Sequence, residues 1–140
     1  MSDINFSSIY DGLTLAVHAA FPAAHVYGGN VRQGIKPGDF NVIMPSAGHV
    51  KQVGRRYLRT PTLDVIYYPA TGMGDCYQTA DILVRVLESI TTPEGDLIHC
   101  TSCEWSVDDG VLHVLVGYDH YTYTPLEQEL METLDIEMEG

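Results

Sequence analysis

The 140-residue chain is poor in positive charge, with seven lysines and arginines against nineteen aspartates and glutamates and a formal net charge of −12 at pH 7. A protein that grips DNA or RNA through phosphate contacts needs a basic surface, so this balance argues against that class. The length suits a single domain. Hydrophobic residues make up 45% of the chain, close to the globular average. We therefore expect one folded body with one core.

Long hydrophobic runs and cysteines are scarce as well. The first five residues, MSDIN, lack the basic and apolar parts of a signal peptide, and no stretch approaches the roughly 20 apolar residues of a membrane span. Three cysteines, Cys76, Cys100 and Cys103, are an odd number at spacings unlike those of a secreted disulfide framework. The sequence predicts a protein that is made and folded in a cytoplasm, with reduced thiols and no membrane contact.

Motifs of catalysis and ligand binding are also missing. The sequence has no G-x-S-x-G, P-loop or G-x-G-x-x-G pattern, and its six histidines show no metal-ligand spacing. Cys100 and Cys103 have the C-x-x-C spacing of zinc and redox sites, but strand alternation would turn Cys103 inward and Cys100 outward. The adjacent carboxylates of Asp108 and Asp109 suit a turn better than a catalytic pair. We predict no catalytic residues, no metal site and no cofactor.

Apolar periodicity and turn residues outline the first half of the chain. A helix is predicted over residues 3–21, ended by Pro22. Beyond it we expect short strands over 24–31 and 40–44, with turns over 34–38 and 46–49. Leu63, Val65 and Tyr67 alternate with residues that face away, as in a half-buried strand. Pro61 fits an edge or a bulge, so Gly54–Arg59 is predicted to project as the arm of a hairpin.

The second half combines a helix with a long hairpin. Asp75 is interpreted as the N-cap of a helix whose apolar stripe runs to Ile90. Asp109-Gly110 is the favoured type I′ turn pair, flanked by strands over 97–108 and 111–123. The two-residue turn sets the register of the hairpin. It places Val107 opposite Leu112, Trp105 opposite Val114, Cys103 opposite Val116, and Thr101 opposite Tyr118.

The predicted fold is therefore of the α+β class, with an antiparallel or mixed β-sheet packed against two helices in the order α-β-β-β-α-β-β. Residues 1–124 would form this domain. A capping box begins at Thr124-Pro125. Residues 125–140 carry six acids and no base, which predicts an acidic C-terminal helix or tail.

Positive charge is concentrated in one segment. Six of the seven basic residues and a single acid, Asp39, lie between Arg32 and Arg59, so this segment carries +5 and the rest of the chain −17. Such a division suits contacts between copies of one chain, although solvated loop charge is the ordinary explanation. The nine tyrosines, three of them between residues 118 and 123, suit an interface or simply a strand. We take these residues as candidate contacts: Arg32, Lys36, Lys51, Arg55, Arg56, Tyr57 and Arg59.

Several ordered segments resemble a known family. They are a helix ending in Ala20-Phe21-Pro22, then Val31-Arg32-Gln33-Gly34, then Gly54–Thr60 running into Leu63–Pro69, and finally Asp109–His113 with Tyr118. Across roughly residues 4–123 this order resembles the small tail terminator proteins of tailed bacteriophages and phage-like particles. The Gly-Arg-Arg-Tyr strand that ends in Tyr-Tyr-Pro is the most specific part, and none of it is a catalytic signature.

The resemblance implies a structural role in the virion tail. Tail terminators form a ring, usually a homo-hexamer, at the head-proximal end of the tail, where they stop polymerisation of the tail tube and provide the surface for head–tail joining. The implied partners are further copies of the chain, the tail tube protein and a head–tail connector protein, with assembly in the host bacterial cytoplasm. DNA would pass through the ring without specific binding, and the basic residues would contact neighbouring subunits or the tube.

Two other functions fit the sequence less well. A head–tail connector or stopper of the phage neck would share the size, the acidity and the ring symmetry. A small enzyme or ligand-binding domain would use a pocket between helix and sheet, and the sequence shows no converging acid, base and nucleophile for it.

Overall fold

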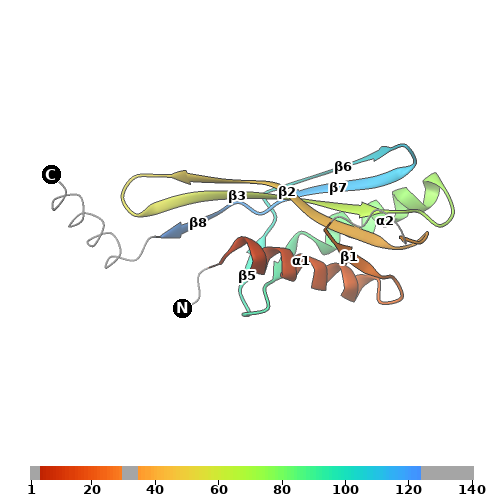
Figure 1. Cartoon of the computed structure of the whole chain (residues 1–140), viewed down its shortest axis with the longest axis horizontal. Coiled ribbons are helices and arrows are strands. Elements are labelled where there is room, and N and C mark those ends of the chain that lie inside the picture. The colour runs from red at the N-terminus through yellow and green to blue at the C-terminus, as the bar shows by residue number, and fades with distance from the viewer. Residues whose placement is uncertain (1–3, 30–34, 124–140) are drawn as a thin grey trace.

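The computed structural model describes residues 4–29 and 35–123. Its elements are, in chain order, α1 Phe6–Ala20, β1 Val26–Gly28, β2 Phe40–Lys51, β3 Arg56–Tyr67, α2 Met73–Val86, β4 Ser89–Thr91, β5 Leu97–His99, β6 Ser102–Asp108, β7 Val111–Gly117 and β8 His120–Tyr123. The main sheet has the order β1-β2-β3-β7-β6, with β8 on the outer part of β3. Both helices and the small β4–β5 sheet lie on one side of it (Figure 1). The α+β class is confirmed.

The core lies between the helices and the inner half of the main sheet. On α1 the spacing of Ile9, Leu13 and Val17 places all three on one fully buried face. Leu63 and Val65 of β3 face them from the sheet, at positions two apart along the strand. The helix begins with a capping box between the Asn5 and Ser8 side chains and main chains, and it ends before Pro22 as predicted.

Strand β2 is much longer than expected, and the turn predicted over 46–49 is wrong. The chain continues in extended conformation from Phe40 to Lys51, with a bulge between Ile43 and Ser46 where Met44 and Pro45 add one residue to the ladder. Pro45 lacks an N–H, and a bulge at the edge of a sheet tolerates it. The segment Ser46-Ala47-Gly48-His49 has no apolar alternation, so only its pairing with β3 makes it a strand.

The prediction for the start of the second helix also needs correction. The N-cap of α2 is Gly72, and Asp75 lies in the first turn of the helix. Burial alone would raise the pKa of Asp75, but hydrogen bonds outweigh it and the pKa is lowered. The donors are the Tyr67 hydroxyl, 2.8 Å from Oδ2, and the Ala70 and Thr71 amides. Asp75 therefore holds the loop from β3 to α2 as well as the helix terminus.

The Asp109-Gly110 hairpin has the predicted register over most of its length. Val107 pairs with Leu112, Trp105 with Val114 and Cys103 with Val116. The pairing of Thr101 with Tyr118 is wrong, because the ladder ends at Ser102 and Gly117 and Tyr118 turns into the core. There its hydroxyl donates to the Leu87 carbonyl at 2.7 Å.

The flanking segments of this hairpin are separate strands. Residues 97–99 pair with β4, and residues 120–123 pair with β3. Only the β7 side of the apolar face is buried, since Trp105 on the edge strand β6 is 44% exposed. The cysteine orientation is reversed, with Cys100 packed against the core and Cys103 exposed. The break between β5 and β6 falls between these two cysteines, so strand alternation does not apply across them.

Candidate assembly interface

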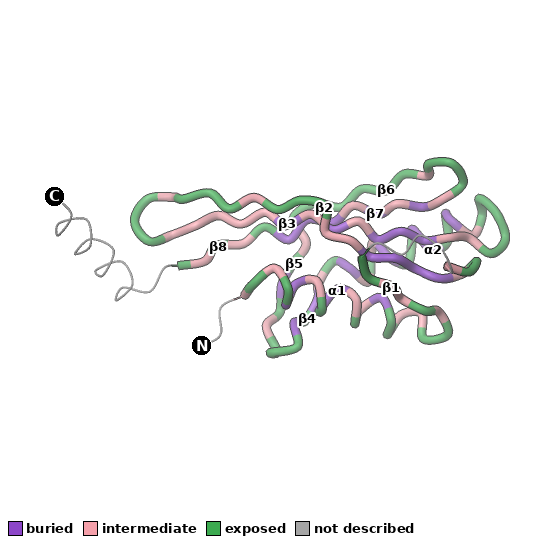
Figure 2. The backbone as a smooth tube through the Cα atoms, in the orientation of Figure 1, coloured by how far each residue is buried: buried purple, intermediate pink, exposed green. Residues whose placement is uncertain are grey.

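A three-stranded arm extends beyond the helices. We define the arm as Ser46–Thr60, which is the outer half of the β2–β3 hairpin, together with β8. In Figure 1 it is the long projection on the left, and Figure 2 shows exposed and half-buried residues along it in contrast to the buried body. Ser46–Lys51 pair with Tyr57–Thr62, and His120–Tyr123 pair with Arg56–Arg59. The prediction that Gly54–Arg59 projects as the arm of a hairpin is confirmed.

The turn at the arm tip is tightly closed. The Gln52 amide donates to the Arg56 carbonyl at 2.7 Å, and Gly54 has a φ of 74°, which favours glycine. Val53, between them, is 92% exposed. Lys51 and Arg55 are exposed on either side of it. The tip is thus an apolar side chain bracketed by two cations.

On the helix-facing side the arm makes contacts within the chain. The guanidinium of Arg59 lies 3.6 Å from the centre of the Phe6 ring at the start of α1. Burial lowers the pKa of Arg59, and its Nε is buried with no hydrogen-bond partner in the part of the chain that the structure describes. Further out, the Tyr57 ring stacks on His49 at 4.5 Å with an interplanar angle of 8°. Arg59 and Tyr57 therefore stabilise the arm.

The opposite side of the arm is aromatic and half-apolar. Arg56 lies over the Tyr121 ring at 4.7 Å. Val50, Tyr121 and Tyr123 are between 51% and 58% exposed. Tyrosine and arginine with scattered aliphatic side chains are the residue types enriched in protein interfaces. This surface has the composition of a contact surface.

The predicted contact residues do not all gather in one place. Lys51, Arg55, Arg56, Tyr57 and Arg59 share the arm. Lys36 is exposed in the turn before β2, where Gly38 donates to the Tyr68 carbonyl at the other end of β3. Arg32 lies outside the described residues. The basic segment of the sequence is therefore divided in space, and only its second half forms the arm.

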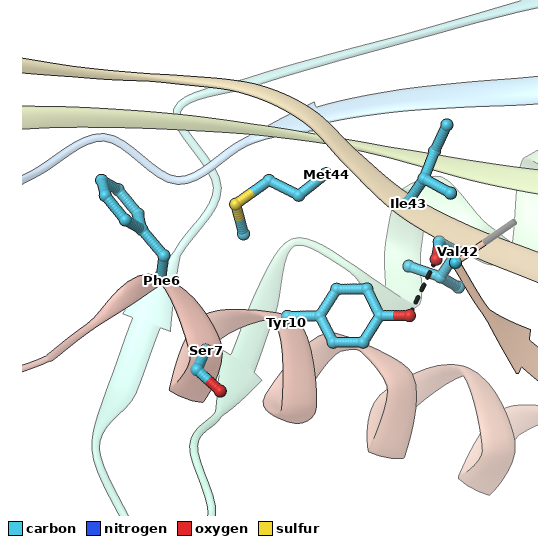
Figure 3. A pocket seen from close by; sticks show the side chains of 7 residues that line it. Phe6, Ser7, Tyr10, Val42, Ile43 and Met44 are labelled. Carbon is cyan, nitrogen blue, oxygen red and sulfur yellow. Dashed lines mark hydrogen bonds between the residues drawn. The ribbon is translucent and has the colours of Figure 1, made fainter.

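An apolar groove between α1 and β2 was missed by the sequence reasoning. It has a volume of about 410 Å³, and Figure 3 shows its lining, which comprises Phe6, Ser7, Tyr10, Gly29, Val42, Ile43 and Met44. The Tyr10 hydroxyl crosses it to donate to the Val42 carbonyl at 2.8 Å. A Cβ on Gly28 would collide with that hydroxyl, so a larger residue there would displace the Tyr10 side chain. No sequence signal marks the groove, because its walls come from segments about thirty residues apart.

The chemistry of the groove is that of a binding surface. Burial, together with the charge of Asp11, raises the pKa of Tyr10, so its hydroxyl stays protonated and occupied by Val42. The described residues of the lining include no histidine, cysteine or carboxylate. Across residues 4–29 and 35–123, no three histidines, cysteines or acids come together as metal ligands. None of the described helices is long and apolar enough to cross a bilayer.

Comparison with known families decides the identity. The family model described as phage tail terminator protein matches residues 8–130. The chain belongs to the phage tail terminator family. This tail terminator is thus a structural component of the phage tail, in a family of structural proteins rather than enzymes.

Other comparisons add little for this tail terminator. No curated protein matches its sequence. One of eleven matching chains among solved structures has 16% sequence identity and covers 85% of this chain and 94% of its own length. The TM-score of 0.46 is too low for that likeness to support an argument.

Proposed function

We propose that this tail terminator forms a ring of identical subunits, a hexamer, at the head-proximal end of the tail tube, where it stops polymerisation and provides the surface that docks to the head. Its partners are then the tail tube protein and a head–tail connector protein, and it assembles in the host bacterial cytoplasm. The observation that carries this proposal is the projecting arm, whose exposed cations Lys51 and Arg55 extend from a body of opposite charge.

A ring requires two different complementary patches on each subunit, because each contact is head-to-tail. The arm supplies a basic patch away from the centre of the molecule. The rest of the chain supplies negative charge, since all acidic residues except Asp39 lie outside the basic segment. Complementary potentials of this kind favour association of like-oriented copies and disfavour self-contact of two arms.

The same charge balance suits a ring that DNA passes through. A formal net charge of −12 repels the phosphate backbone, so an acidic bore would let packaged DNA slide instead of holding it. This function needs no catalytic group.

Tube capping in vitro tests the proposal. Purified tail terminator is added to polymerising tail tube protein, and tube lengths are measured by negative-stain electron microscopy. We expect the wild-type chain to stop elongation and to be seen as a ring on one tube end. The Lys51→Glu, Arg55→Glu double variant should lose capping, because both changes place negative charge opposite an acidic neighbour.

Arg85→Glu is the matched control. Arg85 is exposed on α2 and pairs with Asp81 at 2.9 Å, far along the chain from the arm. It changes the net charge in the same direction and should leave capping intact. If the wild-type chain binds portal-bearing heads but never caps tubes, the tail terminator function is wrong and a neck connector replaces it. If the double variant caps normally, the arm is not the contact.

A further inference from the structure

The arm tip and the groove form a matched pair on one chain. The tip presents Val53, 92% exposed and bracketed by Lys51 and Arg55. The groove presents a mainly apolar lining with Asp11, the next residue after Tyr10, close enough for its charge to act on the Tyr10 hydroxyl. An apolar side chain between two cations thus corresponds to an apolar hollow with a carboxylate beside it.

A single chain cannot bring these two surfaces together. Met44 in the groove and Val53 at the tip lie on one hairpin, nine residues apart in sequence, and the extended strand from Met44 to Lys51 alone spans roughly 23 Å at ~3.3 Å per residue. The strand between them is held in ladders with β3, and β3 is held by β8 on its other side. Arg59 over the Phe6 ring further ties the base of the arm to the groove wall.

We propose that the groove between α1 and β2 is the receptor for the arm tip of a second copy of this chain. Val53 of one copy enters the groove of the next, while its flanking cations approach Asp11. The inference rests on the proposed ring and names the contact that closes it. A knob and a hollow on separate parts of one molecule make a head-to-tail contact, which closes into a ring when the rotation per subunit is suitable.

Two full-length variants test this contact. Val53→Asp removes the knob and keeps the groove. Ser7→Trp fills the groove from an exposed position of α1 and keeps the knob. Leu97→Asp, at a 61% exposed residue of β5 that belongs to neither the tip nor the groove lining, is the control. Circular dichroism and thermal melts confirm that each variant is folded, and sedimentation velocity and native mass spectrometry give the assembly state.

We expect each of the two variants alone to associate about tenfold or more weakly than the wild type, since each loses an apolar contact and one gains a buried charge. Leu97→Asp should assemble normally. An equimolar mixture of Val53→Asp and Ser7→Trp should give a 1:1 dimer and nothing larger. In the mixture, the intact knob of Ser7→Trp enters the intact groove of Val53→Asp. The remaining knob, on Val53→Asp, and the remaining groove, on Ser7→Trp, are both defective, so the dimer cannot grow.

Three results would overturn the inference. Val53→Asp could assemble and cap tubes like the wild type, or the folded mixture could stay monomeric. Ser7→Trp could associate more strongly than the wild type, which would show that the groove holds a segment of its own chain. Each of these leaves tube capping by the wild-type chain intact. Failure of the proposed function is instead seen as wild-type protein that does not cap tubes.

Discussion

At Gly12 the helix α1 closely approaches the backbone of β4. A Cβ on Gly12 would lie 2.8 Å from the Thr91 carbonyl oxygen, between α1 and β4. Glycine in a helix costs stability relative to alanine, so it is kept here because there is no room for a methyl group. Gly74, in the first turn of α2, has nothing within 4 Å of the equivalent position.

These two glycines should respond to alanine in opposite directions. Gly12→Ala is expected to lower the free energy of unfolding by about 1–3 kcal/mol through overpacking. Gly74→Ala should raise it by about 0.4–1 kcal/mol, because it reduces the freedom of the unfolded chain without strain. Urea unfolding followed by circular dichroism measures both. A rise in the free energy of unfolding for Gly12→Ala would show that the α1–β4 contact is looser than described, and a fall for Gly74→Ala would contradict the open space at that position.

Tyr67 links stability to alkaline pH. It is 6% exposed, and burial together with its hydrogen bond to Asp75 raises its pKa from 10.0 to about 12. The unfolded chain releases this proton near the ordinary pKa, while the folded chain keeps it. The contribution of Tyr67 to stability is therefore constant below pH 10 and falls as the pH rises from 10 to 12.

We expect the free energy of unfolding to fall by up to about 1.4 kcal/mol per pH unit in this range for the single proton of Tyr67. Tyr67→Phe should reduce that slope without abolishing it. Tyr118 has a pKa that burial also raises, and it contributes in the same direction. Urea unfolding at several pH values, with tyrosinate absorbance as the second signal, makes the measurement. An unchanged slope in Tyr67→Phe would assign the effect elsewhere.

At the level of elements, the arm is an exposed and half-buried part of the main sheet. Its central strand β3 has neighbours on both sides, β2 and β8. Within residues 4–29 and 35–123, the outer half of β2 pairs only with β3, since β1 covers just Phe40–Val42. Amides that face solvent on a free edge open easily, whereas amides in a ladder are protected.

Hydrogen exchange of the free protein should reflect this arrangement. Alternate amides of β2 over residues 46–51 are expected to exchange rapidly, and those of Tyr57–Thr60 on β3 more slowly. Mass spectrometry with short peptides, or amide NMR, separates the two sets. Uniform fast exchange over 46–60 would mean that the arm is formed only on assembly, and would contradict the stiffness that separates the tip from the groove.

The sequence predicted elements that carry their own local pattern. The first helix has an apolar stripe and a terminating proline, and the Asp109-Gly110 turn sets a register that holds from Cys103 to Val116. The outer half of β2 has no such pattern. It is extended because β3 pairs with it, and this pairing leaves no apolar periodicity in the sequence of the outer half of β2.

The candidate site was predictable in part for the same reason. The cations of the arm are clustered in the sequence, so a basic projection could be anticipated. The packing of Arg59 on Phe6 joins residues 53 positions apart, and the groove joins α1 to β2. Such contacts depend on the tertiary fold. The sequence therefore does not distinguish a charged residue that stabilises the arm, such as Arg59, from one that faces a partner.

At the scale of the whole molecule, assembly should depend on salt. Association of a basic arm with an acidic body is screened as the Debye length falls from about 10 Å at 0.1 M salt to about 3 Å at 1 M. We expect the association constant of the wild type to fall about tenfold or more over this range. The Lys51→Glu, Arg55→Glu variant should show a weaker or reversed dependence in sedimentation equilibrium. Association that strengthens with salt in the wild type would show that apolar contact alone drives assembly.

The bulge at Met44 and Pro45 governs which way the arm side chains of β2 face. Before it Phe40 and Val42 lie on the helix-facing side of the sheet, and after it Ala47, His49 and Lys51 do, because the extra residue shifts the alternation by one. Deletion of one residue at this point would turn the two strands into a regular ladder and leave Ala47, His49 and Lys51 on the same side, opposite the same residues of β3. Related chains could therefore gain or lose this residue without changing which side chains the arm presents to a partner.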